Sequence, residues 1–344
     1  MGSLLLLKNS VPRDAKFRKG VWVLLLSPLG VATLAIFYSL NVSLPSPKAP
    51  IQFYSTHRRD DLKLTLIQAL KRAQFSILLK TYALTDISVL SLLKKKAQAG
   101  VSIDLYYHKQ TTPKLEKLQG PHFHFHPIQG SGLMHEKIWI VDESQIFFGS
   151  ANITYSSLKM HENSILGLYA PDLARVLAQS RPKDLTYSIG GQTMQFFSLP
   201  NKRALEFLIE SLDQAQRRVD LFLFTFTHPD IISKLIELHS RGIHISLAID
   251  AHTARGASKK ALTCLSKSGI SIYVSRGPQL FHHKWALIDQ STLIFGSANW
   301  TKAAFTKNRD FLLLLKPLNK KQIKCIRKII RNSYSNNEKL SFTH

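Results

Sequence analysis

Two segments of the chain repeat the pattern His-x-Lys-x-x-x-x-Asp, the first from His135 to Asp142 and the second from His282 to Asp289. Residues two apart on a strand project to the same face, so each copy places an imidazole beside an ammonium group. A neutral imidazole is a competent nucleophile near pH 7, and a lysine neutralises an anionic substrate. The two copies together indicate chemistry on a phosphodiester.

The residues after each copy argue against an ordinary core strand with a polar start, which would explain a single His-x-Lys well. Gly-Ser-Ala-Asn follows both copies, at 149–152 and 296–299, and its glycine stands at the same interval from each motif aspartate. We therefore expect two half-sites that meet across an internal pseudo-twofold axis. Each half-site would supply one histidine and one lysine to a single phosphate, from the set His135, Lys137, His282 and Lys284.

The repeat also covers the elements that must position these residues. Short apolar runs predict buried strands, and glycine predicts the end of a helix. The matching pairs are strands at 51–55 and 194–198, helices at 62–73 and 204–215, strands at 77–79 and 221–223, helices that end at Gly100 and Gly242, and strands at 101–107 and 243–249. Alternation of strands and helices predicts parallel βαβ units, so the expected fold class is α/β with two homologous halves.

Four parts are expected along the chain. Residues 1–20 form a basic segment and residues 21–43 an apolar one. The first half then spans residues 51–182 and the second spans residues 192–335, each of an ordinary domain size. Pro182 and the Gly-Gly pair at 190–191 mark the joint between the halves.

The two motifs, their order and the matching halves resemble the phospholipase D superfamily from residue 51 to about residue 334. The stretch from Gly296 through Asn-Trp-Thr-Lys to Asp310 is similar to the compact branch of bacterial nucleases and mitochondrial cardiolipin hydrolases. Members of that branch carry one motif per chain and dimerise, so this chain resembles a fused version of such a dimer. The motif is typical of the superfamily but does not specify a substrate.

The resemblance implies a role for each motif residue. One of His135 and His282 would attack phosphorus to form a phosphohistidine, while the other would protonate the leaving oxygen and then deprotonate the incoming water or alcohol. By analogy with fused members, His135 is the expected nucleophile. Lys137 and Lys284 would neutralise the non-bridging oxygens of the phosphate.

Further residues are expected to support this site. The resemblance implies additional donors to the phosphate from Ser150, Asn152, Ser297 and Asn299, and acidic residues beside the histidines from Glu162 and Asp310. A carboxylate beside an imidazole orients it and favours its charged form. The two acidic residues stand at intervals that differ by one residue. Asp142 and Asp289 belong to the motif, but we expect them to anchor the strand turns through hydrogen bonds.

This chemistry requires neither a metal nor another cofactor. His122, His124 and His126 would share one face of a strand, which is an arrangement that suits zinc or copper. The equivalent strand in the second half, residues 270–274, offers no such ligands. We therefore interpret the three imidazoles as a polar strand face, and a metal site there is the alternative.

The N-terminal region determines the expected location. Residues 21–40 form a predominantly apolar run without charged residues that would span about 30 Å as a helix, which matches the core of a bilayer. Basic residues precede it at Lys8, Arg13, Lys16, Arg18 and Lys19. The positive-inside rule then places the catalytic part on the non-cytoplasmic side of a single-pass anchor. A cleaved signal peptide, which would release an exported enzyme, is the alternative.

Charge and cysteine content add two limits. The chain has 46 basic and 22 acidic residues, for a net charge of +24, which predicts an anionic partner such as a membrane surface or nucleic acid. Residues 319–334 predict a helix with one apolar and one basic face, solvated or in contact with such a partner. Cys264 and Cys325 exclude a disulfide framework, and buried free thiols are favoured over one bridge.

Three functions are consistent with these observations. The first is a membrane-anchored phospholipase D that acts on phospholipid, by hydrolysis or by transfer to an alcohol. The second is a nuclease with the same mechanism, and the third is a noncatalytic protein that binds anionic surfaces. Two complete motifs argue against the third. The anchor favours phospholipid over nucleic acid, and fusion of the half-sites removes the need for a dimer.

Overall fold

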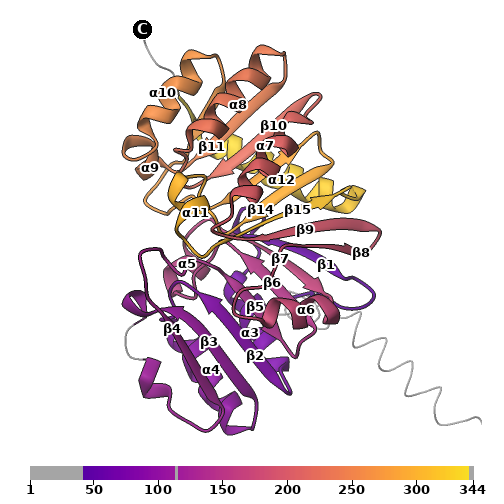
Figure 1. Cartoon of the computed structure of the whole chain (residues 1–344), viewed down its shortest axis with the longest axis vertical. Coiled ribbons are helices and arrows are strands. Elements are labelled where there is room, and N and C mark those ends of the chain that lie inside the picture. Colours follow the sequence, from indigo (N-terminus) through magenta and orange to yellow (C-terminus); the bar gives the residue numbers. More distant parts are fainter. Residues whose placement is uncertain (1–41, 113–114, 341–344) are drawn as a thin grey trace, which may run out of the picture. The chain divides into compact units, whose positions relative to one another are not determined.

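The strands around the two motifs form the centres of two sheets in the computed structural model, which describes residues 42–112 and 115–340. The expected basic segment, residues 1–20, and the apolar run of the expected membrane anchor, residues 21–40, lie outside the described residues. Within the described part of the chain, no helix is long and apolar enough to cross a membrane. Residues 44–344 form one unit, which Figure 1 shows from indigo to yellow along the sequence.

The first sheet has seven strands among the described residues, in the order β1-β7-β6-β5-β2-β3-β4. Strands β2 and β3 pair in parallel, whereas β5 pairs antiparallel with both β2 and β6. The sheet is therefore mixed. Its elements are β1 (Ile51–Ser55), η1 (Thr56–Arg58), α3 (Leu62–Arg72), β2 (Ser76–Thr81), α4 (Ile87–Gln98), β3 (Ser102–His108), η2 (Lys109–Thr111), η3 (Leu115–Leu118), β4 (Phe123–Ile128), β5 (Ile138–Val141), β6 (Gln145–Gly149), α5 (Tyr155–Lys159), β7 (Ser164–Tyr169) and α6 (Pro171–Ala178).

The second sheet repeats this topology and extends it at both edges. Its order in the described residues is β16-β12-β11-β10-β13-β14-β15-β9-β8, so the run from β9 to β12 matches the run from β1 to β4 strand for strand. Its elements are β8 (Leu185–Ile189), β9 (Gln192–Ser198), α7 (Lys202–Asp213), β10 (Arg218–Leu223), α8 (Pro229–Ser240), β11 (His244–Ile249), α9 (Ala251–Arg255), α10 (Lys259–Lys267), β12 (Ser271–Val274), β13 (Lys284–Ile288), β14 (Thr292–Gly296), α11 (Lys302–Thr306), β15 (Phe311–Lys316), α12 (Lys320–Asn336) and β16 (Glu338–Lys339).

Local sequence explains where these elements begin. Asp61 and Asp86 cap α3 and α4, because each carboxylate accepts a hydrogen bond from a backbone N–H in the first turn of its helix. Asn201 caps α7 in the same way. Strands β5 and β13 are buried along their whole length, which fits their position in the middle of a sheet that is covered on both faces.

A shared core joins the two halves. Apolar residues from one face of each sheet pack together, and α6 and α12 add side chains to the same cluster. Phe148 of β6 contacts Phe196 of β9 and Phe311 of β15, with ring centroids 5.8 and 5.2 Å apart. The opposite face of the second sheet carries a separate core with α7, α8 and α10. The two sheets are thus packed against each other between outer helices.

The expected α/β class and the repeat of two homologous halves are confirmed, while the exact domain limits stay a prediction. The structure changes two details of the expected organisation. Gly190 and Gly191, expected at the joint, have positive φ angles of 55° and 74° and form the turn of the β8–β9 hairpin, which belongs to the second sheet. Cys264, expected to be buried, is exposed on α10, and both cysteines are free thiols.

Candidate active site

Backbone pairing brings the two motifs together at the contact between the halves. The N–H of His135 donates to the carbonyl of Arg309 at 2.7 Å, and the N–H of His282 donates to the carbonyl of Glu162 at 2.8 Å. Each motif loop therefore pairs with the segment that precedes β15 or β7 in the other half. Two isolated bridges, Met134 with Arg309 and Phe281 with Glu162, continue this reciprocal pairing. The half-sites meet as a pseudo-twofold arrangement requires.

His135 is held by a carboxylate from the other half. Its Nδ1 lies 2.8 Å from Oδ1 of Asp310, in a pair that is almost fully buried. Because a carboxylate only accepts hydrogen bonds, Nδ1 must carry the proton, which leaves Nε2 with a free lone pair in the neutral ring. Burial lowers the pKa of His135, and the charge of Asp310 opposes that effect. Asp310 thus fixes both the orientation and the tautomer of His135.

His282 is held by an amide at the equivalent position. Its Nδ1 lies 3.1 Å from Oδ1 of Asn163. The amide nitrogen of Asn163 donates to the carbonyl of Ser157 at 2.8 Å, which leaves the amide oxygen to accept from His282. Burial, with the nearby charge of Lys284, lowers the pKa of His282 well below its usual range. The two histidines therefore have the same orientation but different electrostatic support.

Glu162 does not take the place expected for the acidic partner of His282. Asp310 stands 13 residues after Ser297, and the residue 13 after Ser150 is Asn163. The equal interval from each serine predicts Asn163 as the partner of His282. Glu162 was expected instead because it is acidic and precedes Asn163 directly. The Glu162 carboxylate instead lies 3.4 Å from Nε2 of His57. Burial, together with the charge of Asp250, raises the pKa of Glu162 to about 7.

The two serines of Gly-Ser-Ala-Asn are engaged with these same partners. Ser150 donates to Oδ1 of Asn163 at 2.7 Å, and Ser297 donates to Oδ1 of Asp310 at 2.6 Å. Their placement favours a role in orienting the histidine supports over direct contact with phosphate. Asn152 and Asn299 differ, because each has a buried Oδ1 without a hydrogen-bond partner in the described structure. Contact of these asparagines with the phosphate stays a prediction.

Both motif lysines are buried at the same place. The exposed fractions of Lys137 and Lys284 are 0% and 1%, and each ammonium donates to the carbonyl of its own motif histidine, at 2.7 and 2.9 Å. Burial lowers the pKa of Lys137 to about 7, with Asp310 and Glu136 opposing the shift. Burial and the charge of Lys137 lower the pKa of Lys284 well below its usual range. Two buried cations that destabilise each other form a site for an anion.

Two aromatic residues that sequence reasoning missed line this site. Tyr82 follows β2 and Phe224 follows β10. The ring of Tyr82 packs edge-to-face against His135, and that of Phe224 packs in the same way against His282. The ammonium of Lys137 lies 5.7 Å from the Tyr82 ring centroid, and that of Lys284 lies 5.0 Å from the Phe224 ring centroid. Tyr82 and Phe224 directly follow β2 and β10, which match each other in the two halves. This equivalent position is the signal in the sequence that could have identified them.

The motif aspartates lie at the far ends of the motif strands. Asp142 accepts hydrogen bonds from the N–H groups of residues 74–76, and Asp289 accepts from those of residues 216–218. Both residues have left-handed backbone conformations, with φ of 49° and 48°. They connect the turn after the motif strand to the start of β2 or β10. Asp142 and Asp289 thus have the anchoring role that the sequence suggested.

The histidines of β4 do not converge on a shared point. His124 is exposed, and His126 pairs with Asp104 at 2.9 Å while it stacks on Tyr106. In the described part of the chain, the His, Asp and Glu side chains close enough to share an ion are those of His57, Glu162 and His283. His124 and His126 thus lie on a polar and partly exposed stretch of β4.

Comparisons with known proteins identify relatives of both halves. A family model described as "Cardiolipin synthase, PLD-like domain" matches residues 66–180 and 208–332. Human mitochondrial cardiolipin hydrolase is 36% identical over 112 residues, which cover 32% of this chain and 44% of that protein. A phospholipase D from Rickettsia felis is 25% identical over 142 residues, which cover 40% of this chain and 70% of that protein.

The sequence similarity covers only part of each chain, whereas the similarity of fold covers most of both chains. The match spans about half the length of the cardiolipin hydrolases. The crystal structure of phosphatidylserine synthase from Haemophilus influenzae Rd KW20 superposes with a TM-score of 0.69 at 13% identity and covers 86% of this chain and 89% of that one. At this identity the superposition shows a shared fold, with two halves in one chain.

The Asp310–His135 pair makes a prediction about titration. Replacing Asp310 with asparagine keeps the hydrogen bond but removes the negative charge that favours the protonated ring, so the pKa of His135 falls further. Histidine Cε1–H resonances followed against pH would show this as a titration midpoint that moves to lower pH. The wild-type protein titrated under the same conditions provides the control. An unchanged or higher midpoint for His135 would show that Asp310 exerts no electrostatic control.

Proposed function

The chain belongs to the phospholipase D superfamily, and on that premise we propose that it is a phosphodiesterase that cleaves phospholipids through a phosphohistidine intermediate. The observation that carries the proposal is the convergence of two oriented imidazoles and two buried ammonium groups at the contact between the halves. This arrangement offers a nucleophile, an acid and a binding site for a singly charged phosphodiester.

The first step begins at His135. Its Nε2 lone pair attacks phosphorus, because Nδ1 is committed to Asp310 and the carboxylate stabilises the positive charge that develops on the ring. The bond between phosphorus and the leaving alcohol oxygen breaks. His282 must be protonated for this step, and the negative charge of the bound phosphodiester offsets the burial and the lysine charge that lower its pKa. It donates its Nε2 proton to that oxygen and becomes neutral, with Nδ1 held by Asn163.

The second step reverses these roles. Neutral His282 takes a proton from a water molecule whose oxygen attacks phosphorus, and the bond between phosphorus and Nε2 of His135 breaks. His135 returns to its neutral form and His282 to its protonated form. If an alcohol replaces water, the same step transfers the phosphatidyl group. Lys137 and Lys284 neutralise the charge on the non-bridging oxygens in both steps.

Phospholipid is the substrate class that we favour. Of the relatives, the cardiolipin hydrolases and the phospholipase D are named for lipids. The proposed anchor at residues 21–40 would keep the site beside a bilayer, on its non-cytoplasmic side. The net charge of +24 also suits nucleic acid, so a nuclease of the same mechanism is the second candidate.

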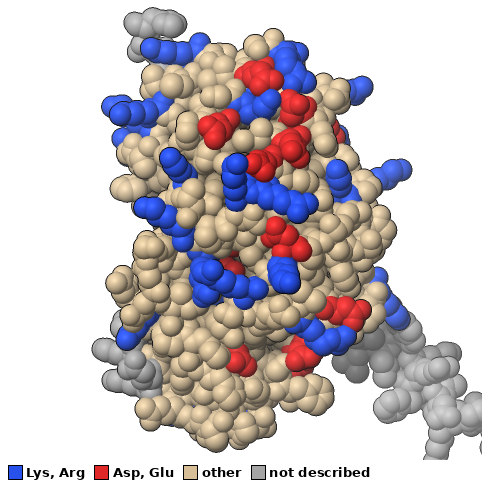
Figure 2. Space-filling view, viewed as in Figure 1, with Lys and Arg blue, Asp and Glu red and all other residues tan. Residues whose placement is uncertain are grey.

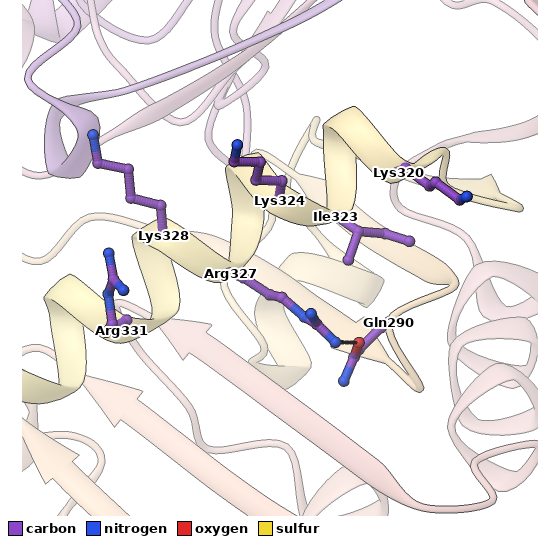
Figure 3. Close-up of a pocket in the computed structure, with 7 residues that line it drawn as sticks. All are labelled: Gln290, Lys320, Ile323, Lys324, Arg327, Lys328 and Arg331. Carbon is purple, nitrogen blue, oxygen red and sulfur yellow. Dashed lines mark hydrogen bonds between the residues drawn. The ribbon is translucent and has the colours of Figure 1, made fainter.

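A basic groove on α12 supports a membrane surface as partner. Its volume is about 820 Å³, and its lining consists of Gln290, Lys320, Ile323, Lys324, Arg327, Lys328 and Arg331 (Figure 3). Among the described residues, these five cations have no carboxylate within salt-bridge distance, and Arg327 donates to the side chain of Gln290. The opposite side of α12 is apolar and buried. Figure 2 shows further lysine and arginine side chains spread over both halves on one face of the molecule.

The substrate assignment is tested with the full chain in detergent, without added divalent metal. We expect release of phosphatidate from mixed vesicles that contain cardiolipin and phosphatidylglycerol, and no cleavage of single- or double-stranded DNA. His135→Ala, which removes the nucleophile, should abolish this cleavage, and His282→Ala, which removes the general acid, should lower the rate by about 10² to 10⁴-fold. His126→Ala, a change of the same kind on β4, should retain full activity. Cleavage of DNA without cleavage of phospholipid would contradict this proposal and support the nuclease.

The groove makes a separate prediction about membrane binding. The triple change Lys324→Gln, Lys328→Gln and Arg331→Gln removes three unpaired cations, each worth about 1 kcal/mol near an anionic surface. Residues 44–344 should therefore bind phosphatidylglycerol vesicles at least about tenfold more weakly in a sedimentation assay. The control removes three exposed lysines of the first half, Lys71, Lys94 and Lys95. Equal losses in both triple variants would mean that net charge alone determines binding and that the groove has no specific role.

A further inference from the structure

A second cluster of polar side chains lies at the contact between the halves, and the proposed reaction does not use it. His57 belongs to η1, directly after β1, and Glu162 lies just before β7. His283 stands between His282 and Lys284 in the second motif. Two of these residues come from the first half and one from the second, so no local stretch of sequence reveals the cluster.

The distances within the cluster suit ligands of one metal ion. Nδ1 of His57 lies 3.0 Å from Nε2 of His283, and Nε2 of His57 lies 3.4 Å from Oε2 of Glu162. One ligand atom from each residue lies within 4.8 Å of the others. Tetrahedral zinc with bonds of about 2.0–2.1 Å places its ligand atoms about 3.3 Å apart. Because the two ring nitrogens of His57 face different residues, only one of them can bind the ion. A rotation of the Glu162 side chain would bring its carboxylate to the same ion as that nitrogen and His283.

Burial leaves this cluster with unsatisfied polar atoms. His283 is fully buried and His57 is 9% exposed, yet Nε2 of His57 and Oε2 of Glu162 have no hydrogen-bond partner in the described structure. A buried polar atom without a partner is costly, and an ion bound by the Glu162 carboxylate and one nitrogen of His57 would reduce that cost. The cluster therefore lacks a component that a divalent cation would supply.

A hydrogen bond outside the cluster engages one ring nitrogen of His283, so the other nitrogen faces the cluster. Its Nδ1 lies 3.1 Å from the hydroxyl of Ser164, and that hydroxyl lies 3.3 Å from the hydroxyl of Ser55. Nε2 of His283 is left facing His57. Metal-binding histidines commonly hold their second nitrogen in a hydrogen bond of this type, which fixes the ring and the tautomer.

An ion can reach the cluster from solvent. A polar pocket of about 510 Å³ opens beside it, and its lining includes His57 and Glu162. The side chain of Glu162 is about one-third exposed, and Asn332 and Ser335 of α12 also line this pocket. Three protein ligands and an open side leave the fourth position of a tetrahedral ion for water.

We propose that His57, Glu162 and His283 form a zinc site that links the two halves behind the second motif. The ligand set of two imidazoles and one carboxylate is one that zinc accepts. Because His283 is adjacent to His282, the ion would fix the loop that presents His282 and would act as a positioning element outside the reaction itself. The proposal is independent of the substrate, since the ligands lie outside the set that contacts phosphate.

The test measures bound metal without any substrate. The full chain is stripped with a chelator, equilibrated with Zn²⁺, dialysed and analysed by mass spectrometry for metal content. We expect about one zinc ion per chain and a higher melting temperature than for the stripped protein. Co²⁺ in place of Zn²⁺ should give the visible absorption bands of a tetrahedral site.

Variants of two ligands show where the ion binds. If one of them does not fold, the other still tests the proposal. Glu162→Gln, a conservative change at a partly exposed residue, should weaken zinc binding by at least about tenfold, and His57→Ala should abolish it. Circular dichroism of each stripped variant reports whether it has folded. The control is the double variant His122→Ala/His124→Ala, just before and within β4, which should still bind one ion. No zinc in the wild type, or loss only in the β4 variant, would overturn the proposal.

Discussion

Two lysine ammonium groups are buried where the halves meet, close enough for the charge of Lys137 to lower the pKa of Lys284, and the site depends on this arrangement. Removing an ammonium from water costs several kcal/mol unless an opposite charge compensates. The carboxylate of Asp310 offsets part of that cost, yet burial still lowers the pKa of Lys137 to about 7. A phosphodiester supplies the missing negative charge.

The supports of the two histidines break the symmetry of the duplicated site. The two halves share strand order, motif and serine hydrogen bonds, but Asp310 supports His135 where Asn163 supports His282. A charged partner stabilises a ring that becomes positive when it bonds to phosphorus. A neutral partner allows a ring to give up and regain a proton. In the proposed reaction, this difference favours His135 for the attack and His282 for proton transfer.

The sequence predicted the α/β class, the repeat and the meeting of the motifs, because apolar periodicity and a duplicated motif are local signals. The supporting contacts were less accessible. Asn163 was missed because an acidic residue stands beside it, and Tyr82 and Phe224 were missed because they lie far from either motif in sequence. The sequence predicts a joint at the turn of the β8–β9 hairpin, because a Gly-Gly turn has the same composition as a linker. Contacts across the halves require the three-dimensional arrangement.

The central claim is that both halves close on one phosphate, and the stoichiometry of anion binding tests it most directly. Titration calorimetry of the full chain with tungstate, a phosphate mimic, should give one bound anion per chain. Lys137→Met and Lys284→Met should each abolish that binding, because the two ammonium groups share the same anion. Two anions per chain, or binding that one of these variants leaves intact, would show that the half-sites act separately.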